Sequence, residues 1–141
     1  GIYDRLHQIL PGKPKQIFLL IGVNDISHDL STDSIVNMIE KNVTRIQRES
    51  PETKLYLQSL LPIDESFNRY KKLTNKTYQI PEINDRLKAL AKEKKIDFID
   101  LYPLFTEKGT NVLRKELTYD GLHLKEEGYK IWVDAIKKKM K

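Results

Sequence analysis

The sequence predicts an α/β domain in which a parallel β-sheet lies between two layers of helices, and three observations support this. Short apolar segments typical of strands alternate along the chain with longer amphipathic segments typical of helices. Alternation of this kind is characteristic of parallel sheets whose strands are joined by right-handed helical crossovers. One apolar run has no polar face, as expected for a strand that is covered on both sides. The length of 141 residues, with 39% hydrophobic and 32% charged residues, suits one globular domain.

The unbroken apolar run is Ile17–Ile21, and the predicted site depends on this strand. Gly22 follows it directly and lets the chain turn sharply where the strand ends. Asn24 and Asp25 then stand at the carboxyl end of the strand, where open α/β sheets keep their ligand sites. We therefore expect a functional loop directly after this strand.

The segments on either side of this strand are predicted from helical spacing and chain breakers. Residues 2–10 have apolar side chains at helical spacing and precede a Pro-Gly pair, which predicts a short opening helix. A second helix is expected from a cap at Ser31 or Asp33 to Ser50, because the proline that follows ends it. Residues 53–59 carry β-favouring side chains in partial alternation and are the second expected strand. The second helix is expected to bury Val36, Ile39, Val43 and Ile46.

The middle of the chain is expected to contain a loop, a helix and a strand. Residues 60–74 have no clear hydrophobic period and are expected to form a long loop. A helix then runs to about Lys94, and Pro81 is tolerated near its start. The apolar residues of 96–99 predict the third strand.

The last part of the chain is expected to be irregular and then helical. Residues 100–124 show no regular pattern apart from one helical turn expected at 104–108. Residues 126–141 are the last expected helix. Its apolar residues are expected to face the core: Tyr129, Trp132, Val133, Ile136 and Met140.

Composition and charge exclude several classes of function. The absence of cysteine excludes disulfides, thiolate catalysis and cysteine-bound zinc. No apolar run approaches the roughly 20 residues that span a bilayer, so no membrane span is expected. The net charge is +5, but four of the last five residues are lysines, which is typical of a solvated helix end. No nucleic-acid-binding pattern accompanies this charge, so no nucleic-acid partner is expected.

Two polar clusters carry the candidate chemistry, and both follow predicted strands. One is the Asn24 loop, and the other is Asp120-Gly121-Leu122-His123, before the last helix. His123 has the right chemistry for a general base near neutral pH. Asp120 can bend back to accept a hydrogen bond from the imidazole Nδ1 and fix its tautomer. Asn24 can donate its amide N–H to a developing oxyanion, a contact worth about 2.7–4 kcal/mol of barrier.

Each cluster also has a purely structural interpretation. Asp120-Gly121 is an ordinary turn dipeptide, and Asn24-Asp25 can bond its own backbone as an Asx-turn. Their order and their shared sheet edge favour one active site over two independent turns. His28 and Asp29 suggest a metal site, but scattered groups in a loop are typically solvated, so no metal is expected.

These residues resemble a known family, the SGNH (GDSL-type) esterases and acylhydrolases. GVND after an apolar strand is similar to block III of the family, and DGLHLKEEGY before the last helix is similar to block V. IDLYPLF and LLP fit the stretches between them, so the likeness covers essentially the whole chain. The resemblance implies a flavodoxin-like three-layer αβα fold. It also implies hydrolysis of a carboxylic ester, such as an O-acetylated carbohydrate or a small acyl ester, through an acyl-enzyme and without a cofactor.

The resemblance also assigns roles to individual residues. Asn24 would be an oxyanion-hole donor, His123 the catalytic base and Asp120 its orienting partner. Asp25 matches block III and would brace the loop. Gly22, Asp25 and Tyr119 are the residues expected around the substrate.

The family's nucleophile is a serine in a GDS motif, and the 141 residues contain no such motif. The chain is therefore expected to be the carboxyl-terminal part of an SGNH domain, without the strand, helix and strand that hold the serine and the block II glycine. The strand Ile17–Ile21 would then have an open edge, so a partner segment or an edge-paired dimer is expected there. Other serines lie near the expected site, but none is expected to be the nucleophile: Ser27, Ser31, Ser34 and Ser59. The first three are not in a strained strand-to-helix elbow, and Ser59 has no glycine neighbours.

Two functions of other classes remain open from the sequence. One is a non-catalytic carbohydrate-binding or scaffolding domain that kept the esterase fold and lost the nucleophile. The other is a nucleotide- or phosphate-binding domain, which is disfavoured because neither GxGxxG nor a P-loop follows any predicted strand. The cellular compartment is not predicted.

Overall fold

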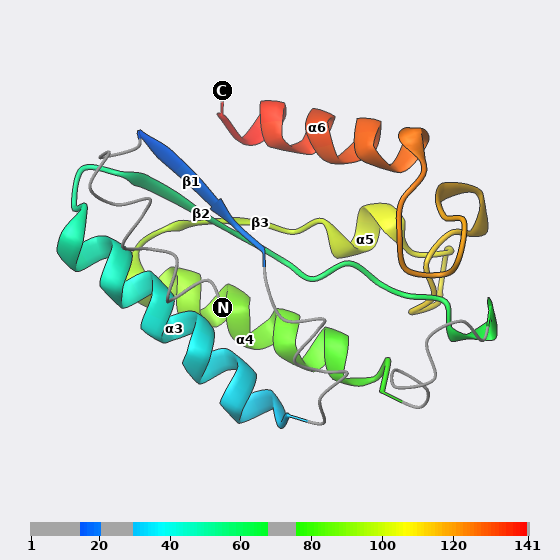
Figure 1. Cartoon of the computed structure of the whole chain (residues 1–141), viewed down its shortest axis with the longest axis horizontal. Coiled ribbons are helices and arrows are strands. Elements are labelled where there is room, and N and C mark those ends of the chain that lie inside the picture. Colours follow the sequence, from blue (N-terminus) through cyan, green and yellow to red (C-terminus); the bar gives the residue numbers. More distant parts are fainter. Residues whose placement is uncertain (1–14, 21–29, 68–75, 141) are drawn as a thin grey trace.

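The computed structural model describes residues 15–20, 30–67 and 76–140, and within them the chain forms a parallel sheet between two helical layers (Figure 1). The sheet has the strand order β1-β2-β3 and both pairings are parallel. The elements are β1 Gln16–Leu19, α3 Thr32–Glu49, β2 Lys54–Gln58, α4 Gln79–Lys94, β3 Asp97–Ile99, α5 Tyr102–Phe105 and α6 Glu126–Met140. The α/β expectation is therefore confirmed. The expected opening helix, 2–10, lies outside the described residues.

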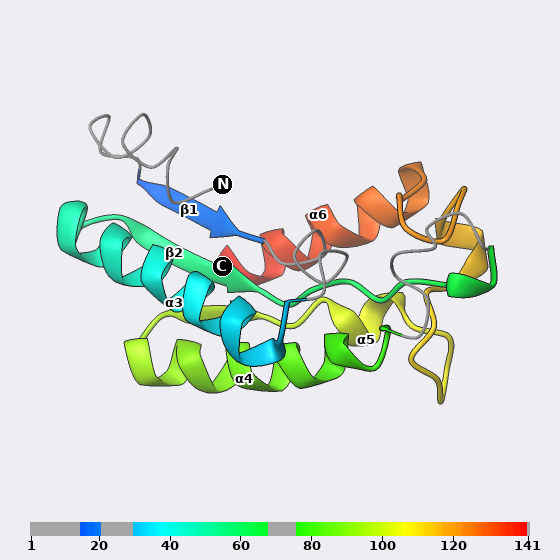
Figure 2. The same cartoon turned by 60° about the horizontal axis from the view of Figure 1, so that its bottom comes forward.

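The two faces of the sheet carry separate hydrophobic cores, because successive side chains of a strand point to opposite faces. On β2, Leu55 and Leu57 join the core shared with α3 and α4. Tyr56, between them, joins the core shared with α5 and α6. Figure 2 shows α3 and α4 on one side of the sheet and α6 on the other. The result is the expected three-layer arrangement.

Strand β1 is shorter than the apolar run that predicted it. It ends at Leu19, which is buried, whereas Ile17 and Phe18 are half-buried. The Phe18 ring stacks on that of its register partner Tyr56, with centroids 4.6 Å apart. Within the described residues β1 pairs with β2 alone and is an edge strand, which explains why its cover is incomplete.

Helix α3 follows its predicted pattern closely. Ser31 caps it, with its side-chain oxygen accepting a hydrogen bond from the Ser34 amide at 3.1 Å. The chain leaves the helix at Ser50, whose N–H donates to the carbonyl of Ile46. All four residues of the predicted stripe are buried: Val36, Ile39, Val43 and Ile46.

The helical turn expected at 104–108 forms earlier, at α5, where the residue that follows β2 caps it. The Ser59 hydroxyl accepts hydrogen bonds from the amides of Leu101 and Tyr102, at 2.8 and 3.0 Å. These bonds satisfy the first free donors of the turn, and Pro103 in the first turn suits its start. Two further short 3-10 turns, Glu65–Phe67 and Lys115–Leu117, lie in segments expected to be irregular.

Helix α6 buries less of its apolar surface than its sequence predicts. Trp132 and Ile136 pack against the second core, together with Ile131 and Ala135. The other three residues expected there are 46–52% exposed: Tyr129, Val133 and Met140. The apolar stripe is therefore wider than the surface that the described sheet offers. The Trp132 indole N–H donates to the buried Gln58 Oε1 at 2.6 Å and joins the helix to β2.

The segment after β2 is fixed by a side chain of α4. Asn84 is buried; its Oδ1 accepts from the Leu60 N–H at 2.7 Å and its Nδ2 donates to the Leu60 carbonyl at 3.1 Å. Leu60 is fully buried, so its two backbone groups have no access to water. Asn84 thus supplies the pairing that a neighbouring strand supplies elsewhere.

Replacing Asn84 with alanine is expected to leave both backbone groups of Leu60 unpaired and buried. We expect Asn84→Ala to lower the free energy of unfolding by about 2 kcal/mol or more, measured by urea denaturation. Asn37→Ala, at an exposed position of α3, is the matched control and is expected to change it by less than about 0.5 kcal/mol. Equal effects of the two substitutions would show that the Asn84 bonds do not stabilise this segment.

Candidate active site

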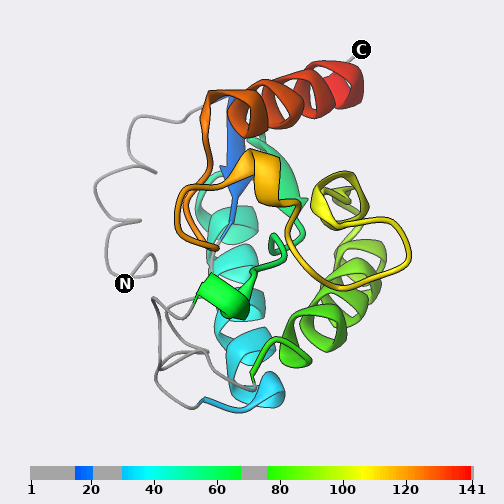
Figure 3. The ribbon, with the colours of Figure 1, turned by 90° about the vertical axis from the view of Figure 1, so that its right-hand side faces the viewer.

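The predicted block before α6 forms a closed loop at one end of the sheet (Figure 3). A backbone bridge between Thr118 and Leu124 closes its base. The Thr118 hydroxyl donates to the carbonyl of His123 at 2.6 Å and accepts from the amides of Asp120 and Gly121, at 3.3 and 3.0 Å. Thr118 is 2% exposed, so one buried hydroxyl holds three backbone groups of the loop.

Asp120 and His123 are paired as the sequence predicts. His123 Nδ1 lies 2.9 Å from Asp120 Oδ2, and Asp120 Oδ1 accepts from the amides of Leu122 and His123, at 3.0 and 2.8 Å. A carboxylate at Nδ1 selects the tautomer with its proton there and leaves Nε2 with the lone pair that a general base needs. The Asp120 side chain is 18% exposed and the imidazole is 66% exposed. The pair is therefore held from the protein side and open toward solvent.

Gly121 lets the loop approach the segment that leaves β2. Its φ is +90°, in the region that favours glycine, and its carbonyl accepts from the Asp64 amide at 2.8 Å. A Cβ at this position would overlap the carbonyl oxygen of Asp64. Glycine is required here for both conformation and space.

Several predicted site residues lie outside the described residues. They are Gly22, Asn24 and Asp25, and also His28 and Asp29 of the weighed metal site. The convergence of Asn24 with His123 therefore stays a prediction. Among residues 15–20, 30–67 and 76–140 there is no group of three or more His, Asp or Glu that suits a metal.

Tyr119, expected beside the substrate, is 71% exposed and directly precedes Asp120. The Lys125 ammonium lies 5.1 Å from the centre of its ring. Two of the serines weighed as nucleophiles have structural bonds instead: Ser31 caps α3, and Ser59 is fully buried and caps α5. Ser59 is thereby removed as a nucleophile.

Two residues of the site were missed by sequence reasoning, Thr118 and Asp64. A threonine two residues before Asp-Gly fits a side-chain-to-backbone turn, and so does Asp64 two residues before Ser66. Both signals are short and common, so neither identified a site residue.

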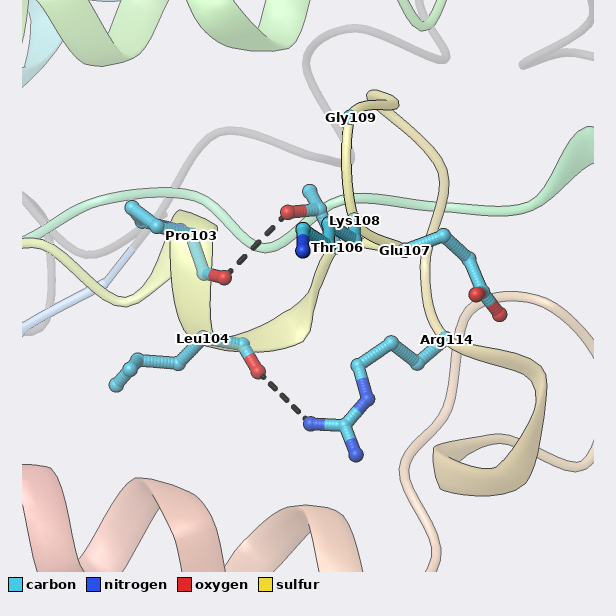
Figure 4. A pocket seen from close by; sticks show the side chains of 7 residues that line it. All are labelled: Pro103, Leu104, Thr106, Glu107, Lys108, Gly109 and Arg114. Atoms are coloured by element: carbon cyan, nitrogen blue, oxygen red, sulfur yellow. Dashed lines mark hydrogen bonds between the residues drawn. The ribbon is translucent and has the colours of Figure 1, made fainter.

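A separate hollow of about 430 Å³ lies beside α5 (Figure 4). It is lined by Pro103, Leu104, Thr106, Glu107, Lys108, Gly109 and Arg114. The guanidinium of Arg114 is already occupied, because it donates to the Leu104 carbonyl at 3.3 Å and to Glu116 at 2.8 Å. Neither Asp120 nor His123 lines this hollow, so it is distinct from the paired loop.

The model of the GDSL-like Lipase/Acylhydrolase family matches residues 1–131. The chain belongs to this family. The match includes both blocks that carried the resemblance, the Asn24 loop and the loop with Asp120 and His123. The family and its α/β fold are thus confirmed.

Several known proteins are similar to this chain in fold or in sequence. A Bacteroides fragilis protein described as an acylhydrolase has a TM-score of 0.87 at 24% identity. The match covers 97% of this chain and 66% of the Bacteroides chain. An acetyl xylan esterase has a TM-score of 0.78 at 22% identity, and the match covers 98% of this chain and 73% of the esterase chain. N-acylneuraminate cytidylyltransferase of Escherichia coli O18:K1:H7 is 27% identical over 121 residues, 85% of this chain. The chain spans 27% of that curated relative's length and about two thirds of the Bacteroides protein.

The Thr118 hydroxyl is expected to be the main group that holds the loop in place. Thr118→Val keeps the shape of the side chain but leaves the His123 carbonyl and two amides without their partner. This is expected to lower the free energy of unfolding by about 1–3 kcal/mol. The amides of Asp120 and Gly121 are expected to exchange hydrogen faster in the variant, measured by NMR. Thr118→Ser keeps the hydroxyl and is expected to protect both amides nearly as well as threonine. Equal protection in the valine variant would contradict the assignment.

Proposed function

We propose that this chain supplies the acid–base part of a serine ester hydrolase, with His123 as the general base and Asp120 as the group that orients it. The observation that carries the proposal is the 2.9 Å contact between His123 Nδ1 and Asp120 Oδ2. Membership of the GDSL-like lipase/acylhydrolase family supports ester hydrolysis as the reaction class. The two amides that bind the other oxygen of Asp120 support an orienting role, because they hold the carboxylate still.

The proposed reaction has two stages. His123 Nε2 takes the proton of a serine hydroxyl as its oxygen attacks the ester carbonyl, and then gives that proton to the departing alcohol. In the second stage His123 takes a proton from water, which attacks the acyl-enzyme, and the proton returns to the serine as the acid leaves. Asn24 would donate its amide N–H to the tetrahedral oxyanion in both stages.

The serine is proposed to come from outside these 141 residues. The sequence has no GDS motif, and the buried Ser59 hydroxyl is used as a helix cap. The proposed place for the serine segment is the edge of β1 that does not pair with β2. The exposed apolar residues of α6 support this, since other residues of that helix pack against the same core as Phe18 of β1. An edge-paired dimer is the alternative, and light scattering on the natural protein distinguishes it from a monomer.

The proposed substrate is an O-acetyl group on a carbohydrate or another small acyl ester. The relative named an acetyl xylan esterase supports an acetylated carbohydrate, and the curated relative, an N-acylneuraminate cytidylyltransferase, is also named for a carbohydrate. The exposed ring of Tyr119 is proposed to contact the sugar. Gly22 and Asp25 are the other residues proposed to bind the substrate.

A non-catalytic carbohydrate-binding domain is the second candidate, and the absence of a GDS motif favours it. The gene sequence on either side of the part that encodes these 141 residues distinguishes the hydrolase from the binding domain. A GDS motif upstream supports the hydrolase, whereas its absence supports the binding domain.

His123→Ala in the natural protein is expected to abolish the turnover of acetyl esters. We expect kcat to fall by about a thousandfold or more, because the serine then lacks its base. The release of acetate from p-nitrophenyl acetate and from acetylated xylan measures the effect. His7→Ala, elsewhere in the chain, is the control and is expected to keep normal kcat and KM. Near-normal turnover by His123→Ala would remove this residue from the proposed role.

A further inference from the structure

Asp64 meets the loop that holds the Asp120–His123 pair through its main chain. Its amide donates to the Gly121 carbonyl at 2.8 Å, and its own carbonyl occupies the space that a Gly121 side chain would need. The two backbones are therefore in direct contact, with no side chain between them. Gly121 lies two residues before His123, so this contact is close in sequence to the imidazole.

The Asp64 side chain fixes the backbone that makes this contact. Oδ1 accepts from the Ser66 amide at 3.0 Å and from the Ser66 hydroxyl at 2.6 Å. These two bonds close a turn that leads into the 3-10 turn Glu65–Phe67. Asp64 is 6% exposed, and its Oδ2 is buried without a hydrogen-bond partner among the described residues. Burying an oxygen without a partner costs free energy on folding, so stability alone does not account for an aspartate at this position.

The segment before Asp64 is held as firmly. The Ile63 carbonyl accepts from the Leu113 amide at 3.3 Å, and Asn84 binds both backbone groups of Leu60. Ile63 and Leu60 are buried. Asp64 thus follows a segment held by these bonds, and its amide bonds directly to the loop that contains Asp120 and His123.

We propose that Asp64 is a positioning residue for the Asp120–His123 pair. It sets the place of Gly121, and through Gly121 the direction of the imidazole toward the substrate. This inference rests on the proposed function for its effect on turnover, but its effect on the imidazole is independent of catalysis. Asp64 itself does not touch the reacting atoms.

The test compares Asp64→Ala and Asp64→Asn in the natural protein. Alanine removes the acceptor for Ser66, so we expect kcat to fall by about tenfold to a hundredfold, as for a small misplacement of the base. KM is expected to stay within about twofold, because substrate contacts are unchanged. Asparagine keeps the acceptor oxygen and is expected to restore most of kcat.

A second readout follows the imidazole directly. NMR of ¹⁵N-histidine reports which ring nitrogen carries the proton, and His123→Ala assigns the signal. Asp64→Ala is expected to weaken the Nδ1–H signature, and Asp64→Asn to keep it. Asp97→Ala is the control, because this partly exposed carboxylate pairs with Lys54 at 3.3 Å, at the start of β3 and outside the loop.

The two proposals fail separately. If the natural protein does not hydrolyse esters, the proposed function fails, and the imidazole signature still tests Asp64. An unchanged kcat and an unchanged Nδ1–H signature in Asp64→Ala overturn the positioning role, and so does an Asp64→Asn variant as impaired as Asp64→Ala.

If Asp64→Ala does not fold, Ser66→Ala removes one of the two bonds to Asp64 Oδ1. The same two readouts then decide the question, with no change in either overturning the proposal.

Discussion

The arrangement of the molecule depends on the six residues that leave β2, Ser59–Asp64. They make no regular secondary structure, yet four of them bond to other parts of the chain. The partners are Leu101 and Tyr102 at Ser59, Asn84 at Leu60, Leu113 at Ile63 and Gly121 at Asp64. Burial makes these bonds obligatory, because water cannot replace them. The segment therefore joins the sheet, α4, α5 and the Asp120–His123 loop into one unit.

The sequence predicted the elements whose signals are local and repeated. The stripe of α3 recurs at helical spacing from Val36 to Ile46, and its cap at Ser31 has a side chain suited to the role. The sequence also predicts the apolar stripe of α6. An amphipathic pattern shows which face of a helix is apolar, but it does not show how much of that face other elements cover. Tyr129, Val133 and Met140 are exposed for this reason. The position of α5 depends on the Ser59 hydroxyl, some 40 residues away in sequence. Reasoning from the residues around the turn cannot detect so distant a partner.

The same distinction applies to the site. Asp120 and His123 are three residues apart, so one loop brings them together and their pairing follows from the sequence. Thr118 and Asp64 act through bonds to backbone groups, and such bonds have little sequence signature. Asp64 also acts across 57 positions of the chain, from one loop to another. Asn24 lies outside the described residues, so its proposed role rests on the family resemblance.

The two partners of the Asp120–His123 pair face different surroundings, with the carboxylate sheltered and two thirds of the ring in water. Water around a ring screens the attraction between the charges that develop during an acyl transfer, since the effective dielectric constant is high there. A bulky ester that covers the ring displaces that water and strengthens the same attraction. If the proposed reaction takes place here, a bulky acylated sugar would thus react faster than a small ester, because it shields the ring from water.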